Sequence, residues 1–487
     1  MTSILGISAF YHDSAAALVV DGNIIAAAQE ERFTRIKHDP SYPFHAVNFV
    51  LKYGNLNLID IDHIVFYEKP FLKFERLLET YLAFAPAGFK SFSMSMPLWI
   101  KDKLYQKKML FDKLKNHDEN FKDINKLNFS EHHFSHAASA FYPSPFKDAT
   151  ILTLDGVGEW ATTTVCEGED EKIKILKEIN FPHSIGLLYS AFTYYTGFKV
   201  NSAEYKVMGL APYGEPKYKN IIYDNLIDVK EDGSFRMNMS YFNYATGLTM
   251  TNDKFSRLFG KPVRNSEEEP LEQFHMDIAS SVQAVIEEIV LKITKSLSQS
   301  MNSKNLCLAG GVALNCVANG KILKNNLYKN IWIQPAAGDA GGALGAALGF
   351  WYQELGNKRT ANKNDSMQGS YLGPSFKDQE VEKLLSSLNA NFKKYDENQL
   401  MDITAQELSK GKTVGWFQGR MEFGPRALGA RSIIADPRNE DMQKELNLKV
   451  KFRESFRPFA PSILKEELTN WFDLDCDSPY MLLVTNI

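Results

Sequence analysis

Three histidines stand within five residues of one another in the stretch EHHFSHAASAFYPSPF, residues 131–146. His132 and His136 are four positions apart, so on a helix both imidazoles would lie on one face, a spacing that metal sites use. His133 would point elsewhere on such a helix, and we expect it to be structural. The pair alone is a weak signal, because histidines are common on helix surfaces. The alternative is that the cluster caps and decorates a helix start.

Two aspartates could complete a metal site with these histidines. Asp155 and Asp339 each follow an apolar, strand-like run and stand in a glycine-containing loop, from which a side chain can reach a cleft. Aspartates in such loops also serve as simple caps, so both interpretations stay open. Two imidazoles with one or two carboxylates suit Fe²⁺, Zn²⁺ or Mn²⁺ better than Ca²⁺.

A glycine-rich loop, GGVALN at residues 310–315, stands between a short apolar strand and a helix. At such a place a phosphate or a nucleotide can approach backbone N–H groups. The loop lacks the G-K-[ST] ending of a P-loop, and it also lacks the G-x-G-x-x-G pattern. Tight packing of the strand against the helix is the alternative.

The last part of the chain carries arginines in loops rather than in helices with acidic partners at helical spacing. They occur in QGRMEFGPRALGARSIIADPR and KVKFRESFRPFAP, beside glycine, proline and aromatic residues. The planar guanidinium fork matches phosphate and carboxylate oxygens, so we expect these arginines to bind anions. The first stretch contains Arg420, Arg426, Arg431 and Arg438, and the second adds Lys449, Lys451, Arg453 and Arg457.

The elements that would position these residues begin with three short strands, predicted at 3–9, 15–20 and 24–29. Asp21-Gly22 between the last two is a strong hairpin signal. Residues 150–165 repeat the pattern of an apolar strand, a glycine-containing loop and a β-branched strand. Two such units in one chain predict a duplicated α/β domain with a cleft between its halves.

The polar stretch 356–370 has no periodicity and is the best linker candidate, so we predict a first domain at 1–356 and a second at 371–487. Within the first, the apolar spacing at 276–297 predicts a helix. Further elements are predicted as a strand and helix in 305–323, helices at 381–388 and 401–411, and a strand at 413–419.

Composition limits the class of protein. The 487 residues are enough for roughly two to four domains. Hydrophobic content of 44% and charged content of 23% are those of a globular chain. A net charge of −4 gives no reason to expect nucleic-acid binding. The scattered cysteines fit a reducing compartment, and no apolar run approaches the ~20 residues of a membrane span, so we expect a cytoplasmic protein.

The motifs together resemble one family, the O-carbamoyltransferases of the nodulation and antibiotic-tailoring type. The resemblance covers essentially the whole chain, and this order of motifs is highly specific. The segments that carry it are GISAFYHDSAAALV, QEERFTRIKHD, EHHFSHAASAFYPSPF, TLDGVGEW, MGLAPYG, LAGGVALNCVANGKI, GDAGGALGAA, FQGRMEFGPRALGARSIIADPR and FRESFRPFAPSIL.

The resemblance implies a fold for each domain. The first is expected to have the duplicated actin-like ATPase fold of the tRNA threonylcarbamoyl-adenosine transferases, and the second a YrdC-like α/β fold. Family members usually continue well past the point where this chain ends in DSPYMLLVTNI. We therefore expect a C-terminally shortened YrdC-like domain whose last residues form an apolar strand with an exposed edge.

The resemblance also implies a two-step reaction. The second domain would make carbamoyl-adenylate from carbamoyl phosphate and ATP, with Mg²⁺. The first domain would pass the carbamoyl group to a hydroxyl of a sugar or another small molecule. A divalent metal, foremost Fe²⁺, with Zn²⁺ or Mn²⁺ as alternatives, would polarise the carbonyl group.

Residue by residue, the resemblance assigns roles to the candidates. It implies His132, His136, Asp155 and Asp339 as metal ligands, and His12, in the Y-H-D turn, as the base or orienter for the acceptor hydroxyl. A turn histidine that bonds its own backbone is the alternative for His12. Lys37 would contact the nucleotide or the carbamoyl group. Gly310, Gly311 and Asn315 would line the adenosine pocket. Five arginines would hold carbamoyl phosphate and the adenylate, namely Arg420, Arg426, Arg431, Arg453 and Arg457.

Other functions remain open. The first domain could modify tRNA, although the acidic net charge and the second domain argue against it. The chain could instead be an inactive or split nucleotide-binding fragment that needs a missing C-terminal part. A simple sugar kinase would leave the arginine-rich region unexplained. We expect residues 68–130 and 215–270 to shape acceptor specificity or to form a homodimer contact.

Overall fold

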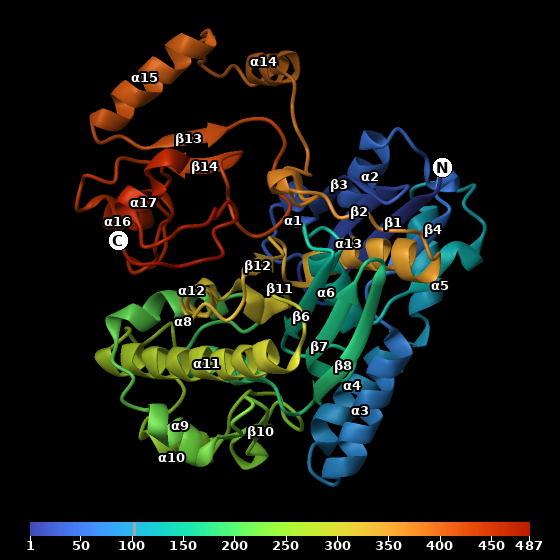
Figure 1. Ribbon diagram of the computed structural model, residues 1–487, viewed down its shortest axis with the longest axis vertical. Coiled ribbons are helices and arrows are strands. Elements are labelled where there is room, and N and C mark those ends of the chain that lie inside the picture. The colour runs from blue at the N-terminus through green and yellow to red at the C-terminus, as the bar shows by residue number, and fades with distance from the viewer. Residues whose placement is uncertain (101–103) are drawn as a thin grey trace. The chain divides into compact units, whose positions relative to one another are not determined.

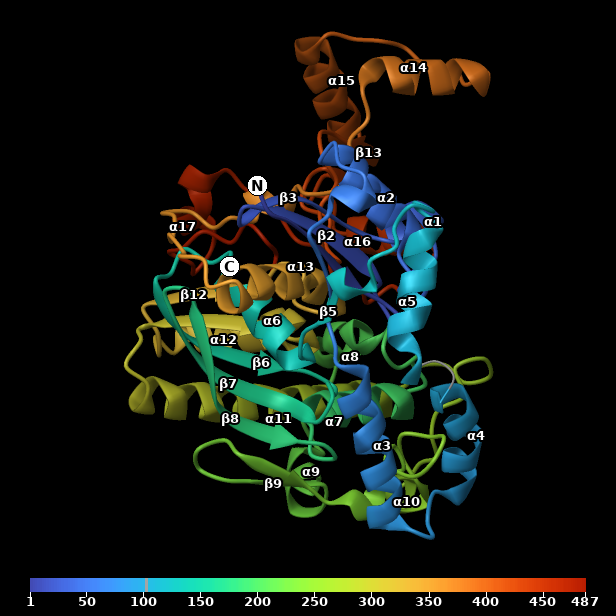
Figure 2. The same ribbon diagram turned by 90° about the vertical axis from the view of Figure 1, so that its right-hand side faces the viewer.

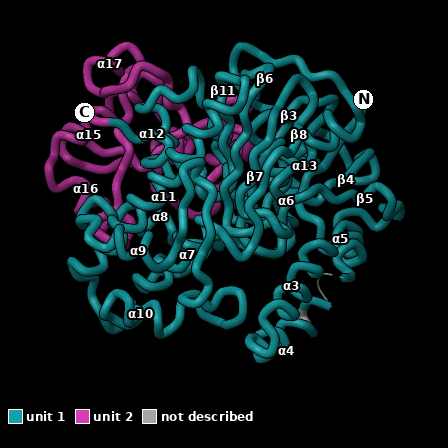
Figure 3. The backbone as a smooth tube through the Cα atoms, turned by 60° about the horizontal axis from the view of Figure 1, so that its bottom comes forward, with its two compact units in different colours: residues 1–366, 482–485 teal, residues 367–481, 486–487 magenta. Residues whose placement is uncertain are grey.

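The first strand, β1 (Ser3–Ser8), is buried along its whole length and is the middle strand of a five-stranded sheet in the computed structural model (Figure 1). The structure describes residues 1–100 and 104–487. They form two compact units, residues 1–366 with 482–485 and residues 367–481 with 486–487 (Figure 3). The two units divide between residues 366 and 367, which lies between the domain boundaries expected at 356 and 371. The assignment of a function to each domain stays a prediction.

The first sheet has the strand order β3-β2-β1-β4-β5. β1 pairs antiparallel with β2 and parallel with β4. The predicted hairpin between β2 and β3 is confirmed, and Asp21 and Gly22 at its turn have positive φ values of 47° and 79°. The other strands are β2 (Ala15–Val20), β3 (Asn23–Gln29), β4 (His63–Phe66) and β5 (Leu127–Phe129).

The second sheet repeats this topology with the order β12-β11-β6-β7-β8. In chain order, β6, β7 and β8 form an antiparallel meander. β11 then pairs parallel with β6, and β12 pairs parallel with β11. Both sheets thus have the order 3-2-1-4-5, as the sequence-based prediction of two copies requires. The strands are β6 (Asp148–Leu154), β7 (Ala161–Glu169), β8 (Lys172–Asn180), β11 (Asn305–Ala309) and β12 (Asn330–Ile333).

Two helices occupy equivalent places in the two copies. α6 (His132–Phe141) follows β5, the fifth strand of its sheet, and α13 (Asp339–Gly349) follows β12, the fifth strand of the other. α13 packs against both α6 and β1. Its glycine and alanine residues make this close packing feasible, since an ideal Cβ at Gly6 of β1 would lie only 1.8 Å from the Ala343 carbonyl oxygen.

The long helix α11 (Gln273–Ser300) covers the region predicted as helical at 276–297, so that prediction is confirmed. Its buried stripe is the one read from the sequence and consists of Ile278, Val282, Val285, Ile289 and Ile293. Helices α7 (Ile185–Tyr195), α8 (Glu204–Leu210), α9 (Lys219–Asn225) and α12 (Cys316–Lys324) pack against it. This layer holds the glycine-rich 310–315 loop beside β6.

The remaining helices of the first unit lie in its N-terminal half and in the 215–270 region. α3 and α4 lie side by side (Figure 2). Their bounds, with those of a small hairpin, are α1 (Glu31–Thr34), α2 (Phe44–Tyr53), α3 (Pro70–Phe84), α4 (Phe89–Trp99), α5 (Gln106–Lys115), α10 (Asp253–Phe259), β9 (Ile227–Val229) and β10 (Phe235–Met237).

The stretch 356–370 has no α-helix or strand, and its residues 356–366 belong to the first unit while 367–370 belong to the second. Arg359 in it is only 8% exposed. Its guanidinium donates hydrogen bonds to the carbonyl oxygens of Phe141, Tyr142, Ser144, Phe146 and Asp170. Most of these carbonyls lie at and just after the C-terminal end of α6, where helix carbonyls lack intrahelical partners.

In the second unit, the elements predicted at 381–388, 401–411 and 413–419 are present with shifted ends. β13 and β14 form an antiparallel ribbon, and neither α14 nor α15 contains a buried residue. The bounds are α14 (Asp378–Ser387), α15 (Glu397–Ser409), β13 (Val414–Phe417), β14 (Arg431–Ile434), α16 (Met442–Glu445) and α17 (Leu468–Trp471).

The prediction of a strand in DSPYMLLVTNI is wrong. Residues 482–485 belong to the first unit and have no strand partner among the described residues. The Val484 N–H donates to the Cys316 carbonyl oxygen at 3.1 Å, and the Asn319 amide donates to the Leu482 carbonyl oxygen at 3.1 Å. Leu482 is buried. The apolar pattern therefore reflects packing against α12 rather than a sheet edge.

All four cysteines are free thiols, and burial raises the pKa of Cys166 and of Cys307 to about 12. In the part of the chain that the structure describes, each helix is too short or too polar to cross a bilayer.

Candidate metal centre

The four proposed metal ligands converge in the first unit. One ligand atom from each of His132, His136, Asp155 and Asp339 lies within 4.8 Å of the others. The Nε2 atoms of the two histidines are 3.1 Å apart, and His132 Nε2 is 2.9 Å from Asp155 Oδ2. Asp339 Oδ1 lies 3.7 Å from His132 Nε2 and 3.6 Å from His136 Nε2. Two nitrogens and two carboxylates thus face a common point.

The start of α6 is held by the loop that follows β6. The His132 N–H donates to both oxygens of Glu159 at 3.1 Å, and the Lys69 N–H donates to the same carboxylate at 2.7 Å. Glu159 therefore accepts a backbone N–H at the start of α6, as an N-cap side chain does in other helices. Gly158 packs against His132, since an ideal Cβ there would lie 3.1 Å from His132 Cβ. The histidine is fixed by the loop that also carries Asp155.

Asp155 is oriented by the glycine-rich loop. Its Oδ1 accepts a hydrogen bond from the Gly311 N–H at 3.1 Å, which leaves Oδ2 facing the histidines. Gly310 has a φ of 87°, and an ideal Cβ at that position would lie 2.3 Å from the Leu154 carbonyl oxygen. Only glycine satisfies both constraints. Nothing in the sequence indicates that this loop also positions a proposed ligand.

Asp339 is the first residue of α13, where the helix N-terminus favours a negative charge. Its Oδ2 accepts a hydrogen bond from the Tyr67 hydroxyl at 3.3 Å and lies 3.8 Å from His12 Nε2. Tyr67 is fully buried. The two oxygens of Asp339 therefore face different partners, Oδ1 the α6 histidines and Oδ2 the groups from the first sheet.

The electrostatics of the cluster favour charged groups despite their burial. Burial alone would raise the pKa of Asp155, but hydrogen bonds from His132 and His136 hold it well below its usual value. Burial would likewise raise the pKa of Asp339, and the charges of His12 and His132 lower it. Burial would depress the pKa of His136, but its bonds to Asp155 and Asp339 raise it to about 9.

The donor set fits a divalent transition metal. The two Nε2 atoms point at one another across 3.1 Å, and a cation between them would use both lone pairs. Nitrogen and carboxylate donors suit Fe²⁺, Zn²⁺ and Mn²⁺. The Nδ1 atoms of His132 and His136 are buried and have no hydrogen-bond partner among the described residues, so each can carry the ring proton.

His133 has partners of its own. Its Nδ1 lies 2.8 Å from Thr153 Oγ1 and 2.9 Å from Thr164 Oγ1. Burial lowers its pKa to about 3, so it is neutral at ordinary pH. The side chain bonds to the sheet, as expected of a structural histidine.

The structure brings His12 to the metal cluster. Its Nδ1 lies 2.9 Å from Asp13 Oδ2, while Nε2 faces Asp339. The other Asp13 oxygen lies 2.8 Å from His38 Nδ1. Burial would lower the pKa of His12, but the charge of Asp339 and the bond to Asp13 raise it to about 9. The sequence analysis missed Asp13, and its position directly after His12 was the available signal.

Lys37 and Asn315 have other partners. The Lys37 ammonium donates to the Tyr205 hydroxyl at 2.7 Å from an exposed position. Asn315 caps α12 through the Ala318 N–H, and its amide exchanges two hydrogen bonds with Gln283 of α11. The side chain of Asn315 therefore has a structural role that its place in the glycine-rich loop did not predict.

The guanidinium groups of Arg420, Arg431, Arg453 and Arg457 have partners within the second unit. Arg431 pairs at 2.9 Å with the buried Glu422, an acidic partner that is distant in sequence. The arrangement of the others is similar. Arg420 donates to the carbonyl oxygens of Leu372 and Gly373, Arg453 donates to Asn447, Arg457 lies 3.5 Å from Glu454, and the Arg426 carbonyl accepts from Arg431.

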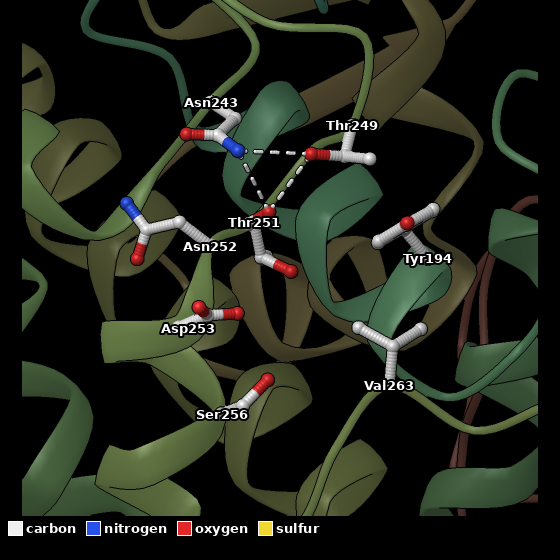
Figure 4. Close-up of a pocket in the computed structure, with 8 residues that line it drawn as sticks. All are labelled: Tyr194, Asn243, Thr249, Thr251, Asn252, Asp253, Ser256 and Val263. Atoms are coloured by element: carbon white, nitrogen blue, oxygen red, sulfur yellow. Dashed lines mark hydrogen bonds between the residues drawn. The ribbon is translucent and has the colours of Figure 1, made fainter.

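A separate pocket of about 300 Å³ lies in the 194–263 region (Figure 4). In it the Asn243 amide donates to Thr249 Oγ1 at 2.9 Å. Its lining consists of Tyr194, Asn243, Thr249, Thr251, Asn252, Asp253, Ser256 and Val263. The lining includes no predicted site residue, so this pocket is distinct from the metal cluster.

Comparison with known families defines the class of this protein. The family profile for the carbamoyltransferase N-terminus matches residues 3–348, and the profile for the carbamoyltransferase C-terminus matches residues 405–487. The chain belongs to the carbamoyltransferase family. The resemblance inferred from the motifs is confirmed, and so is the expectation of a transferase enzyme.

Several relatives cover most of the chain. An uncharacterized protein of Synechocystis sp. is 60% identical over all of this chain and 80% of its own length. Nodulation protein NolNO of Sinorhizobium fredii is 37% identical over 96% of this chain, and nodulation protein NolO of Bradyrhizobium diazoefficiens is 35% identical over 73%. The aligned regions span 64% and 63% of these two nodulation proteins, less than two thirds of their lengths.

Proposed function

We propose that this chain is an O-carbamoyltransferase that uses carbamoyl-adenylate and a divalent metal, with a hydroxyl group of a sugar or another small molecule as acceptor. The convergence of His132, His136, Asp155 and Asp339 in a carbamoyltransferase chain carries the proposal. The two sheets of order 3-2-1-4-5 support an actin-like ATPase fold for the first unit. For the second unit we propose the YrdC-like role.

The reaction has two parts. In the first, water cleaves the P–O bond of carbamoyl phosphate, which releases phosphate and leaves carbamate. A carbamate oxygen then attacks the α-phosphorus of ATP, and pyrophosphate leaves. We assign this step, with Mg²⁺, to the second unit and to Arg420, Arg426, Arg431, Arg453 and Arg457. In the second part, the acceptor oxygen attacks the carbamoyl carbon and AMP leaves. The mixed anhydride is a good carbamoyl donor, so it needs protection from water.

The proposed ligands would hold Fe²⁺, Zn²⁺ or Mn²⁺, with Fe²⁺ foremost. When bound, such an ion supplies a Lewis acid for the carbonyl group. The chain itself keeps Asp155 and Asp339 ionised through their histidine neighbours and holds Asp155 in place through the Gly311 N–H. The ligands are therefore pre-organised for a cation.

His12 is the proposed base for the acceptor hydroxyl. Asp13 accepts the proton on Nδ1, which leaves the Nε2 lone pair on the side of Asp339. Because Asp339 and Asp13 raise its pKa to about 9, His12 is mostly protonated near pH 7, and only its neutral form can take the hydroxyl proton as the C–O bond forms. Lys37, whose side chain is exposed and bonds to the Tyr205 hydroxyl, remains a proposed contact of the nucleotide or the carbamoyl group.

The glycine-rich loop is the proposed adenosine site. Gly310 and Gly311 offer close access to the backbone, as nucleotide-binding loops require. Asn315 would act mainly by holding the loop, since its amide is bonded to Gln283 and to the α12 N-terminus.

A metal-content measurement tests the centre. His136→Ala and Asp339→Asn should each lose most of the bound Fe²⁺ or Zn²⁺ measured by mass spectrometry after equilibrium dialysis. His133→Gln is the matched control, because it removes a histidine of the same helix that bonds to threonines. Equal metal content in all four proteins would refute the assignment.

A product assay tests the two-step reaction. Wild-type protein, ATP, carbamoyl phosphate and Mg²⁺ should release pyrophosphate, and Arg426→Ala should abolish that release. His132→Ala should leave it intact, because the metal centre is proposed to act only in the transfer. Absence of pyrophosphate from folded protein that binds ATP would contradict adenylate synthesis by this chain.

A further inference from the structure

Helix α3 buries the face that its sequence would be expected to expose. Its buried residues are Pro70, Lys73 and Arg76, while Phe71 is 64% and Leu82 is 72% exposed. Charged side chains are rarely buried unless they are paired, and an ordinary surface helix buries its apolar stripe. Two inward cations on one face therefore require either partners or a function.

The two cations differ in their partners. Lys73 Nζ lies 2.6 Å from Glu68 Oε2, so its charge is compensated. Arg76 is 6% exposed, and no carboxylate of the described residues lies within 4.0 Å of its guanidinium nitrogens. Its Nη1 donates to the Gly158 carbonyl oxygen at 2.6 Å, and the guanidinium lies 5.2 Å from the centre of the Phe181 ring.

A second buried arginine shows what a purely structural role looks like in this fold. Arg359 is 8% exposed and donates to five carbonyl oxygens. Arg76, at similar burial, donates to one. A guanidinium has five N–H donors, and neither Nε nor Nη2 of Arg76 is among the side-chain atoms that are both buried and unpaired. Arg76 thus keeps donors available for an acceptor from outside the protein.

The guanidinium lies beside the proposed metal centre. Gly158, which it contacts, belongs to the loop that carries Asp155 and packs against His132. Burial raises the pKa of Tyr11 to about 12, the charges of Asp339 and Asp155 add to this, and the charge of Arg76 opposes it. Tyr11 is therefore close to both the carboxylates and the arginine.

The neighbouring acids do not occupy Arg76. Glu68 binds Lys73, and Glu159 accepts the backbone N–H groups of Lys69 and His132. Burial lowers the pKa of Arg76 to about 10, so it remains a cation near neutral pH. A buried cation with unused donors beside a metal centre is suited to an oxyanion.

We propose that Arg76 binds the phosphate of the nucleotide at the metal centre, an anion contact supplied by the first unit rather than by the arginines of the second. The proposal rests on the proposed function, because it takes the adenylate as the substrate. In this role Arg76 would hold the phosphate as the carbamoyl group departs and would favour the leaving AMP.

Calorimetric titration of metal-loaded protein with AMP and with adenosine tests this role. The ratio of the two dissociation constants isolates the phosphate contribution. Arg76→Met should weaken AMP binding by about 10-fold to 100-fold and leave adenosine binding unchanged. Arg76→Lys keeps the charge but loses the planar guanidinium, so its AMP affinity should lie between those of the wild type and Arg76→Met. This variant provides the test if the methionine variant does not fold.

Arg359→Lys is the matched control, because it alters an equally buried arginine with only carbonyl partners, and its AMP-to-adenosine ratio should equal that of the wild type. An unchanged ratio in both Arg76 variants would overturn the proposal and leave the proposed function standing. A wild-type protein that binds AMP no better than adenosine would instead contradict the nucleotide chemistry of the proposed function itself, and the role of Arg76 with it.

Discussion

Gly345 of α13 lies so close to Ser135 of α6 that an ideal Cβ on the glycine would be 1.8 Å from the serine carbonyl oxygen. The same helices carry Asp339 at one start and His132 at the other. Their close approach therefore sets the separation of the proposed nitrogen and oxygen ligands. The contact involves backbone on one side, so it cannot be relieved by a side-chain rotation.

Gly345→Ala should force α13 and α6 apart. We expect the free energy of unfolding to fall by about 2–3 kcal/mol, as for overpacked cores, and metal occupancy to fall with it. Chemical denaturation and metal analysis measure the two effects. Gly338→Ala is the control, since nothing lies within 4 Å of an ideal Cβ there, and it should have little effect on stability. Equal stability of the two variants would contradict the packing argument.

His117 should make the folded state sensitive to mild acid. Its Nδ1 lies 2.8 Å from Asn48 Oδ1 and its Nε2 lies 3.1 Å from the Tyr42 hydroxyl, an arrangement for a neutral ring. Burial lowers its pKa from 6.5 to about 4. Above the unfolded value both states are neutral, so the stabilisation is fully present there. As the pH falls from about 6.5 toward about 4, only the unfolded chain takes up the proton, and stability is lost.

The comparison of wild type with His117→Gln isolates this contribution. Urea denaturation near pH 7.5 and near pH 5 should show a smaller loss of stability for the variant than for the wild type. Because His117 is partly exposed, solvent weakens the effect, and the sign is the decisive observation. The same pH dependence in both proteins would exclude His117 as its source.

Arg359 should contribute strongly to stability. Replacing it with methionine leaves the carbonyl oxygens beyond α6 without their buried donor. We expect a loss of about 3 kcal/mol or more in the free energy of unfolding, measured by chemical denaturation. Arg264→Met is the control, because Arg264 also donates to carbonyl oxygens but mostly at exposed positions, those of Glu269 and Pro270. A similar loss in both variants would show that burial is not the cause.

Much of the architecture could be predicted because it depends on local patterns. The positive φ values of Asp21 and Gly22 are those that the Asp-Gly turn signal implies, and the apolar stripe of α11 follows from its spacing. The shared face of His132 and His136 also follows from helix geometry. These features need no knowledge of what packs against them.

The rest depends on contacts between distant segments. Nothing in the sequence near Arg76 shows that α3 buries its cations, because that depends on the loop containing Gly158. The capping role of Asn315 requires Gln283 of another helix. The apolar end of the chain reads as a strand, and its hydrogen bonds to Cys316 and Asn319 show that it packs on α12. In each of these three cases the local structure depends on a partner that is distant in the sequence.

The repeated topology has a consequence for the symmetry of the proposed metal centre. His132 and Asp339 are the first residues of α6 and α13, and each helix follows the fifth strand of its own copy. They therefore occupy matching points about a pseudo-twofold relationship. A homodimer of single copies would carry the same residue at both points. Once fused into one chain, the copies can diverge, and one point can supply imidazole while the other supplies a carboxylate.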